Sequence, residues 1–160
     1  MQNNEQIPES VWADGIPENI QEEDKINQEQ LLMMAVDYIT KSVIIPKGFK
    51  IEQGFPRKDF PNIICKKDGQ LYSICVIPSV YPNFVAINDE FRLQLVELAK
   101  KINAISLFAP VGYKSIDEER AKAQIMLRGD VFQTAFPGFI IVNDEPTQDV
   151  RPVNNKLFRP

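Results

Sequence analysis

The sequence predicts an α/β (α+β) domain with a mixed three- to five-stranded sheet flanked by helices. Three patterns support this class. Asp68-Gly69 separates two apolar segments and supplies the positive-φ pair that a type I′ hairpin turn requires. Residues 27–45 and 89–102 each place apolar side chains at helical spacing. An apolar segment at 104–111 follows the second helix, so we expect a strand that returns to the sheet.

The first helix begins at Asn27, which is a suitable N-cap residue, and Gln30 occupies the capping-box position. Pro46 and Gly48 are expected to end this helix, because proline removes a backbone donor and glycine favours helix ends. Residues 49–52 alternate apolar and polar side chains, which predicts a half-buried strand.

The predicted hairpin joins a strand at 62–67 to a strand at 71–77. The second strand is nearly all apolar, as expected for a central strand that is covered on both faces. We expect Pro78 to end this strand and Pro110 to end the strand at 104–111, because proline cannot donate to a ladder.

A third helix is predicted by the capping box of Ser115 and Glu118, and Gly129 would close it in the left-handed conformation. Residues 139–142 predict a last short strand. The expected order is therefore α-β-β-β-α-β-α-β.

The chain divides into three parts by composition. Residues 1–28 form an acidic leader that we expect to be partly disordered or docked on the body. Residues 29–145 form a single domain, and residues 146–160, which contain three prolines, form a surface tail. The net charge of −4 conceals an asymmetry, because residues 1–30 carry eight acids and one base whereas the rest carries 17 bases and 14 acids.

Several function classes are excluded by composition. The 160 residues include no histidine, so Ser-His-Asp and Cys-His catalysis and histidine metal sites are impossible, and we expect no metal and no cofactor. No apolar run is long enough for a membrane span, and the acidic N-terminus is unlike a signal peptide, so we expect a cytoplasmic protein. The hairpin register pairs Cys65 with Tyr72, so Cys65 and Cys75 are not opposite each other across the hairpin. Both cysteines are interpreted as small core residues.

The hairpin segment 60–77 resembles the heart of the PD-(D/E)XK superfamily of restriction-endonuclease-like nucleases. In that superfamily a proline and an acid open one strand, and an acid-x-lysine triplet lies on the next. Residues 107–112 also resemble the strand and turn after the second helix in small bacterial relatives. The resemblance covers residues 29–143 and implies the core order α-β-β-β-α-β.

All three catalytic positions that the resemblance implies have lost the required group. The first acid falls at Asn62, the second acid at Cys75 and the lysine at Ile77. An amide, a thiol and a methyl-bearing side chain do not replace two carboxylates and a cation around Mg²⁺. We therefore expect no hydrolytic site at the matching positions.

A nuclease with migrated ligands is the enzyme alternative. Glu52 and Asp59 lie close to the hairpin in sequence and Lys66 or Lys67 could supply the cation. The simpler interpretation makes Glu52 the solvent side of an edge strand and Asp59 a loop residue.

The sequence leaves a binding or accessory role as the main hypothesis. The ridge where the active site of the resembled family would lie carries neutral and apolar residues, which suits an unknown protein partner or a homodimer mate better than a metal. We place this contact surface at Asn62, Cys75, Ile77 and the loop of Tyr81, Pro82, Asn83 and Phe84. The alternative is a non-catalytic DNA-binding protein that uses Lys66, Lys67, Lys100 and Lys101. Neither hypothesis involves a membrane.

Overall fold

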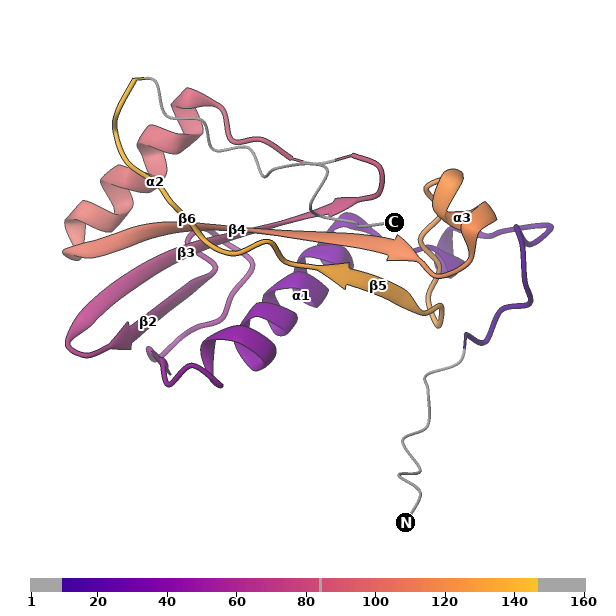
Figure 1. Cartoon of the computed structure of the whole chain (residues 1–160), viewed down its shortest axis with the longest axis horizontal. Coiled ribbons are helices and arrows are strands. Elements are labelled where there is room, and N and C mark those ends of the chain that lie inside the picture. The colour runs from indigo at the N-terminus through magenta and orange to yellow at the C-terminus, as the bar shows by residue number, and fades with distance from the viewer. Residues whose placement is uncertain (1–9, 84, 147–160) are drawn as a thin grey trace, which may run out of the picture.

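The computed structural model describes residues 10–83 and 85–146. Figure 1 shows a mixed sheet with helices on both faces, which confirms the predicted class. The sheet has six strands, ordered β1-β2-β3-β4-β5 with β6 also on β4, so it exceeds the predicted upper number by one. The elements are η1 (Glu22–Asp24), α1 (Gln28–Tyr38), η2 (Ile39–Ile44), β1 (Lys50–Ile51), β2 (Ile63–Lys67), β3 (Gln70–Val80), α2 (Asp89–Lys101), β4 (Ala104–Ser115), α3 (Glu118–Lys122), β5 (Phe132–Ala135) and β6 (Ile140–Ile141).

Helix α1 begins as the sequence predicts. The Asn27 side chain accepts from the Gln30 backbone N–H at 2.8 Å, and the Gln30 side chain accepts from the Asn27 N–H at 2.9 Å. This capping box satisfies donors that the first helical turn would otherwise leave unpaired. The helix then widens into the π-helical segment η2, and the chain turns at Gly48 with a φ of 85°.

The β2–β3 hairpin is confirmed in turn and register. Asp68 and Gly69 have φ values of 51° and 81°, as a type I′ turn requires. Cys65 is paired with Tyr72 across the ladder, and Lys67 with Gln70.

Prolines 78 and 110 do not end their strands, which corrects two predicted boundaries. The Val76 N–H points toward β2, so the nitrogen of Pro78, two residues later, faces the same side beyond the last β2 pair at Ile63 and Ile74. Pro110 lies between Phe108, which pairs with β6, and Gly112, which pairs with β5. Each proline therefore lies where its missing N–H leaves no neighbouring strand unpaired.

The sheet is the middle of three layers. Strands β3 and β4 run parallel at its centre, and α2 is the crossover between them. Helix α1 covers one face and α2 the other (Figure 1). The α1 side holds the larger core cluster and the α2 side a smaller one around Cys75, Leu95 and Phe108. None of the helices in the described part of the chain combines the length and hydropathy that a membrane crossing requires.

The described part of the leader, residues 10–28, lies against the end of the sheet where β3 and β4 finish. Arg120 is 2% exposed, and its Nη1 donates to the carbonyl oxygens of Ala13 and Gly15, both at 2.7 Å. The same guanidinium donates twice to the Asp130 carboxylate, at 3.1 Å each. A buried arginine therefore anchors the leader to the domain.

Helix α3 is shorter than predicted and starts from another cap. Asp117 is the N-cap and accepts from the Arg120 N–H at 3.0 Å, whereas Ser115 donates to Asp130 at 2.8 Å. The helix ends at Lys122, far before Gly129. Residues 125–128 instead turn back to pair with the leader, so the expected long helix is wrong.

Candidate functional site

The Asn62 side chain is a structural clamp at the first position of the nuclease-like motif. It is fully buried, and its Nδ2 donates to the backbone oxygens of Arg57, Lys58 and Asp59 at 3.2, 3.2 and 3.4 Å. Its Oδ1 accepts from the Val76 N–H at 2.8 Å. A carboxylate has no proton to donate, so an acid here would face three carbonyl oxygens. Asn62 thus holds the loop before β2 and has no oxygen free for a metal.

Cys75 is buried in the interior, and Ile77 is partly buried beside it. Cys75 is 1% exposed under α2, and Ile77 packs against the same cluster. Burial raises the pKa of the Cys75 thiol far above its ordinary value, which leaves a small apolar side chain. The expectation that Asn62 and Cys75 line an exposed ridge for a partner is therefore wrong, because α2 and the 57–61 loop cover this part of the sheet.

Glu52 and Asp59, the acids of the nuclease alternative, do not form part of a metal-binding cluster in the described residues. Glu52 follows β1 as a half-buried residue, and its N–H donates to the Ile64 oxygen at 2.9 Å. Asp59 is exposed on the loop that Asn62 holds. Among residues 10–83 and 85–146 there is no group of three or more acidic or thiol side chains placed to hold a metal ion.

The predicted binding residues separate into two groups at opposite ends of the sheet. Tyr81 and Asn83 follow the end of β3, where the Lys114 ammonium lies 4.3 Å from the Tyr81 ring centre and Asn83 donates to Gln124 at 3.3 Å. Phe84 lies outside the described residues. Lys66 and Lys67 lie at the other end, beside the hairpin turn.

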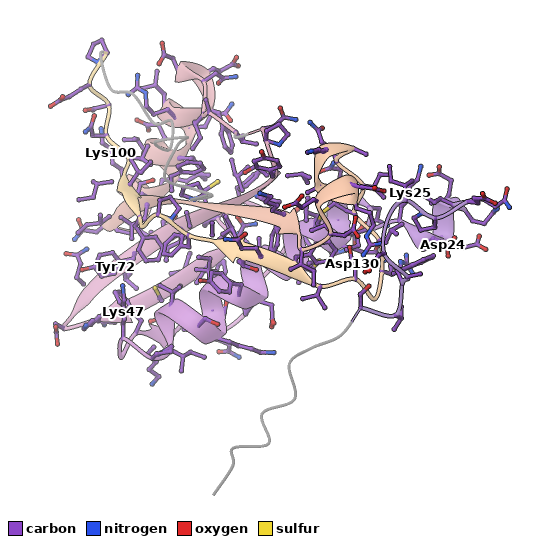
Figure 2. All side chains as sticks on the ribbon, turned by 45° about the vertical axis from the view of Figure 1, so that its right-hand side comes forward. Asp24, Lys25, Lys47, Tyr72, Lys100 and Asp130 are labelled. Atoms are coloured by element: carbon purple, nitrogen blue, oxygen red, sulfur yellow. The ribbon has the colours of Figure 1, made fainter. Side chains whose placement is uncertain are left out.

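Four lysines lie at the hairpin end of the sheet, distributed over both of its faces, and are called here the lysine end: Lys47 (Figure 2), Lys50, Lys66 and Lys67. Lys50 and Lys66 are directly opposite each other in the β1–β2 ladder, and both are exposed. The Lys67 ammonium lies 5.1 Å from the Phe49 ring centre, and Phe49 stacks edge-on with Tyr72. None of the four lysines forms an ion pair with a described residue. Asp68 at the turn offsets part of their charge.

Lys100 and Lys101 lie at the same end but in different surroundings. Lys100 donates to the Asp144 carboxylate at 3.1 Å, and this contact holds the pKa of Asp144 below its usual value. Lys101 is exposed at the last turn of α2. The α2–β4 turn adjoins the hairpin, because the Gln70 side chain donates to the Asn103 oxygen at 3.4 Å.

The lysine end and the docked leader therefore lie at opposite ends of the molecule. Figure 2 shows Lys47, Tyr72 and Lys100 toward one end and Asp24, Lys25 and Asp130 toward the other. The two ends are separated by roughly the length of the 11-residue strand β3, about 36 Å at 3.3 Å per residue. The described leader residues consequently do not cover the lysine end, so their carboxylates do not screen the charge of these lysines.

Lys47 and Lys50 were not recognised from sequence. The alternation of residues 49–52 predicted the strand, but its partner and register depend on the tertiary fold. The pairing of Lys50 with Lys66 therefore has no local signal.

Comparison with known proteins gives a family but no activity. No curated protein matches the chain. The family model described as Domain of unknown function (DUF8840) matches residues 28–142, from the first residue of α1 to just after β6. This match covers most of the chain and the whole of the sheet, and the protein therefore belongs to the DUF8840 family.

Proposed function

We propose that this chain is a non-catalytic, cytoplasmic nucleic-acid-binding module that contacts phosphates through its lysine end. The observation that carries the proposal is the exposed, directly opposed pair of Lys50 and Lys66. Like charges at opposed positions of a ladder repel each other, and a phosphate between the two ammonium groups would convert that repulsion into attraction.

The neighbouring side chains fit the same ligand. Lys67 adds a positive charge on the other face of the same sheet end, Lys47 lies toward this end (Figure 2), and the acids of the described leader lie at the far end of the sheet. The half-buried rings of Phe49 and Tyr72 pack edge-on, with ring centres 5.3 Å apart, on the α1 side of the sheet, opposite the face that carries Lys50 and Lys66. The surface is therefore a rigid, positively charged end of a sheet, which suits the regular spacing of charges along a nucleic-acid backbone.

The fold behind this surface is proposed to be a degenerate restriction-endonuclease-like core. The order α1, β1, β2, β3, α2, β4 supports this, because it is the order that the resemblance implies. The hydrogen bonds of Asn62 support the loss of catalysis, since this side chain serves the 57–61 loop instead of a metal.

The test is fluorescence anisotropy of the full chain with a labelled duplex and its single strand at ~50 and ~200 mM salt. The variant K50Q/K66Q removes two charges at the lysine end, and K122Q removes an exposed charge at the other end. We expect salt-sensitive binding that falls at least about tenfold in K50Q/K66Q and stays within about twofold in K122Q. Absence of binding at the lower salt, or equal losses in both variants, would overturn the proposal.

Incubation of the same oligonucleotides with Mg²⁺ or Mn²⁺ separates binding from the nuclease alternative. We expect no cleavage with either metal. Cleavage that disappears in D59A or E52A would establish the migrated site and refute a non-catalytic role.

A further inference from the structure

The outer face of α2 carries a stripe of six residues that no other described element covers. We call it the α2 stripe, and it lines a shallow hollow of about 490 Å³: Glu90, Leu93, Gln94, Glu97, Leu98 and Lys101. Leu93 is 45% exposed and Leu98 37%, whereas Leu95, Val96 and Ala99 on the opposite face are buried against the sheet. The two leucines line one continuous hollow and form an apolar patch on the solvent side of the helix.

The chemistry of the α2 stripe is self-complementary. An acid stands at its first position and a base at its last, with a leucine next inward from each and two polar residues in the centre. A two-fold axis beside the stripe, at the level between Leu95 and Val96, would place a second copy antiparallel to the first. Glu90 would then face Lys101 of the copy, and each Leu93 would face a Leu98.

The same arrangement satisfies the centre of the stripe. Gln94 would face Glu97 of the copy, so an amide would meet a carboxylate at both central contacts. Antiparallel helices also bring the positive end of each helix dipole beside the negative end of the other. Every residue of the stripe would thus have a suitable counterpart.

The side chains involved are available for these contacts. Within the described residues, Glu90, Glu97 and Lys101 form no ion pair. The neighbouring Lys100 is the residue that holds Asp144, which keeps the chain after β6 on the sheet side of α2.

We propose that the α2 stripe is an isologous interface through which two copies of this chain pair with antiparallel α2 helices. The patch spans a single helix face, which is smaller than the roughly 800 Å² per partner of a standard stable interface. The dimer is therefore weak, with a dissociation constant above about 10 µM. This proposal does not use the four residues of the lysine end, although Lys101 lies at the same end of the sheet.

The decisive experiment is a reciprocal charge exchange, measured by sedimentation velocity of the full chain from about 5 µM to about 1 mM. Wild type should pass from 18.3 kDa toward twice that mass. E90K alone and K101E alone should each remain monomeric, because two like-charged contacts form across the axis. An equimolar mixture of E90K and K101E should dimerise again, since both contacts then join opposite charges.

Two further variants serve as controls for this test. L98Q should weaken the dimer at least about tenfold while the circular-dichroism spectrum stays unchanged, because Leu98 is exposed in the monomer. K122E, at the far end of the molecule, should dimerise like wild type. A wild type that stays monomeric at about 1 mM overturns the proposal. So does a mixture of E90K and K101E that fails to dimerise, because another occupant of the stripe, such as residues 147–160, gives no reciprocal rescue.

Discussion

Asn62 and Val76 are joined by a buried hydrogen bond of 2.8 Å, from the Val76 N–H to the Asn62 Oδ1. This contact lies one step beyond Ile63 and Ile74, the last pair of the β2–β3 ladder, and a side-chain oxygen takes the place of a backbone carbonyl as acceptor. The amide nitrogen of the same residue holds the preceding loop. The residue at the first nuclease-like position is thus fully engaged in the architecture of the sheet.

Substitution of Asn62 by aspartate tests this role. We expect N62D to lower the free energy of unfolding by about 2–4 kcal/mol, because a buried carboxylate would face carbonyl oxygens and donate nothing. Urea denaturation at neutral pH measures the change, and N83D on an exposed turn should shift it by less than about 0.5 kcal/mol. An N62D protein that Mg²⁺ stabilises would contradict our account and restore a metal site.

The Arg120–Asp130 pair should set the acid stability of the fold. Burial pushes the pKa of Asp130 upward, but hydrogen bonds from Ser115, Arg120 and the Val131 N–H outweigh it and hold the pKa below its ordinary value. A carboxyl group with a depressed folded-state pKa stabilises the protein above its unfolded-state pKa, near 4. That contribution is lost as the pH falls through the lower folded value.

D130N should therefore flatten the fall in unfolding free energy below about pH 4. At neutral pH it should cost about 3–5 kcal/mol, because the buried Arg120 then keeps only the more distant Asp117 carboxylate, at 3.9 Å, as its counter-charge. Denaturation curves between about pH 3 and pH 7 measure both effects. Some pH dependence should persist in D130N, because hydrogen bonds from the Gly15 and Arg120 N–H groups also lower the pKa of Asp117. Identical acid profiles for D130N and wild type would refute this role.

Removal of the leader should destabilise the domain. A chain that starts at Pro17 lacks the Ala13 and Gly15 carbonyls that accept from Arg120, and hydrogen bonds to a charged group contribute about 1.5–3 kcal/mol each. We expect a loss of at least about 3 kcal/mol by thermal or urea unfolding. W12F removes the single 2.7 Å hydrogen bond to the Arg128 oxygen and should cost about 1 kcal/mol. Unchanged stability after truncation would show that the leader is dispensable.

The two thiols should be inert in the native protein. Burial raises the pKa of Cys65 to about 11, with nearby Glu52 adding to the shift, and it raises that of Cys75 further still. Because the thiolate is the reactive form, labelling with a disulfide reagent near pH 8 should be slow until denaturant is added. Rapid labelling of one thiol per native chain would mean that this part of the sheet opens.

Local signals predicted the parts of this fold that depend on neighbouring residues. The Asn27 capping box and the Asp68-Gly69 turn formed as expected, because both are decided within a few residues. The strand ends predicted at Pro78 and Pro110 were wrong, because a missing N–H interrupts a strand only where a neighbouring strand would accept from it. Strand β5 escaped prediction, since its four residues are defined by pairing with β4.

The site was less predictable than the fold. The sequence shows that Asn62, Cys75 and Ile77 are not the acids and lysine of the motif that the hairpin resembles, but it does not show that Asn62 and Cys75 are buried. Lys66 and Lys67 were found from the hairpin, whereas Lys50 joins them through the register of β1 on β2. The end of the sheet that the leader contacts likewise has no local signal in the sequence.

The most direct measurement is the salt dependence of oligonucleotide binding by wild type, K50Q/K66Q and K122Q. Each lysine that neutralises a phosphate contributes about 0.9 to the slope of log K against log salt on a duplex. We predict that K50Q/K66Q lowers the magnitude of this slope by about 1.8, while K122Q leaves it unchanged. An unchanged slope in K50Q/K66Q would mean that the opposed lysines of the β1–β2 ladder do not touch the backbone, and the central claim would fail.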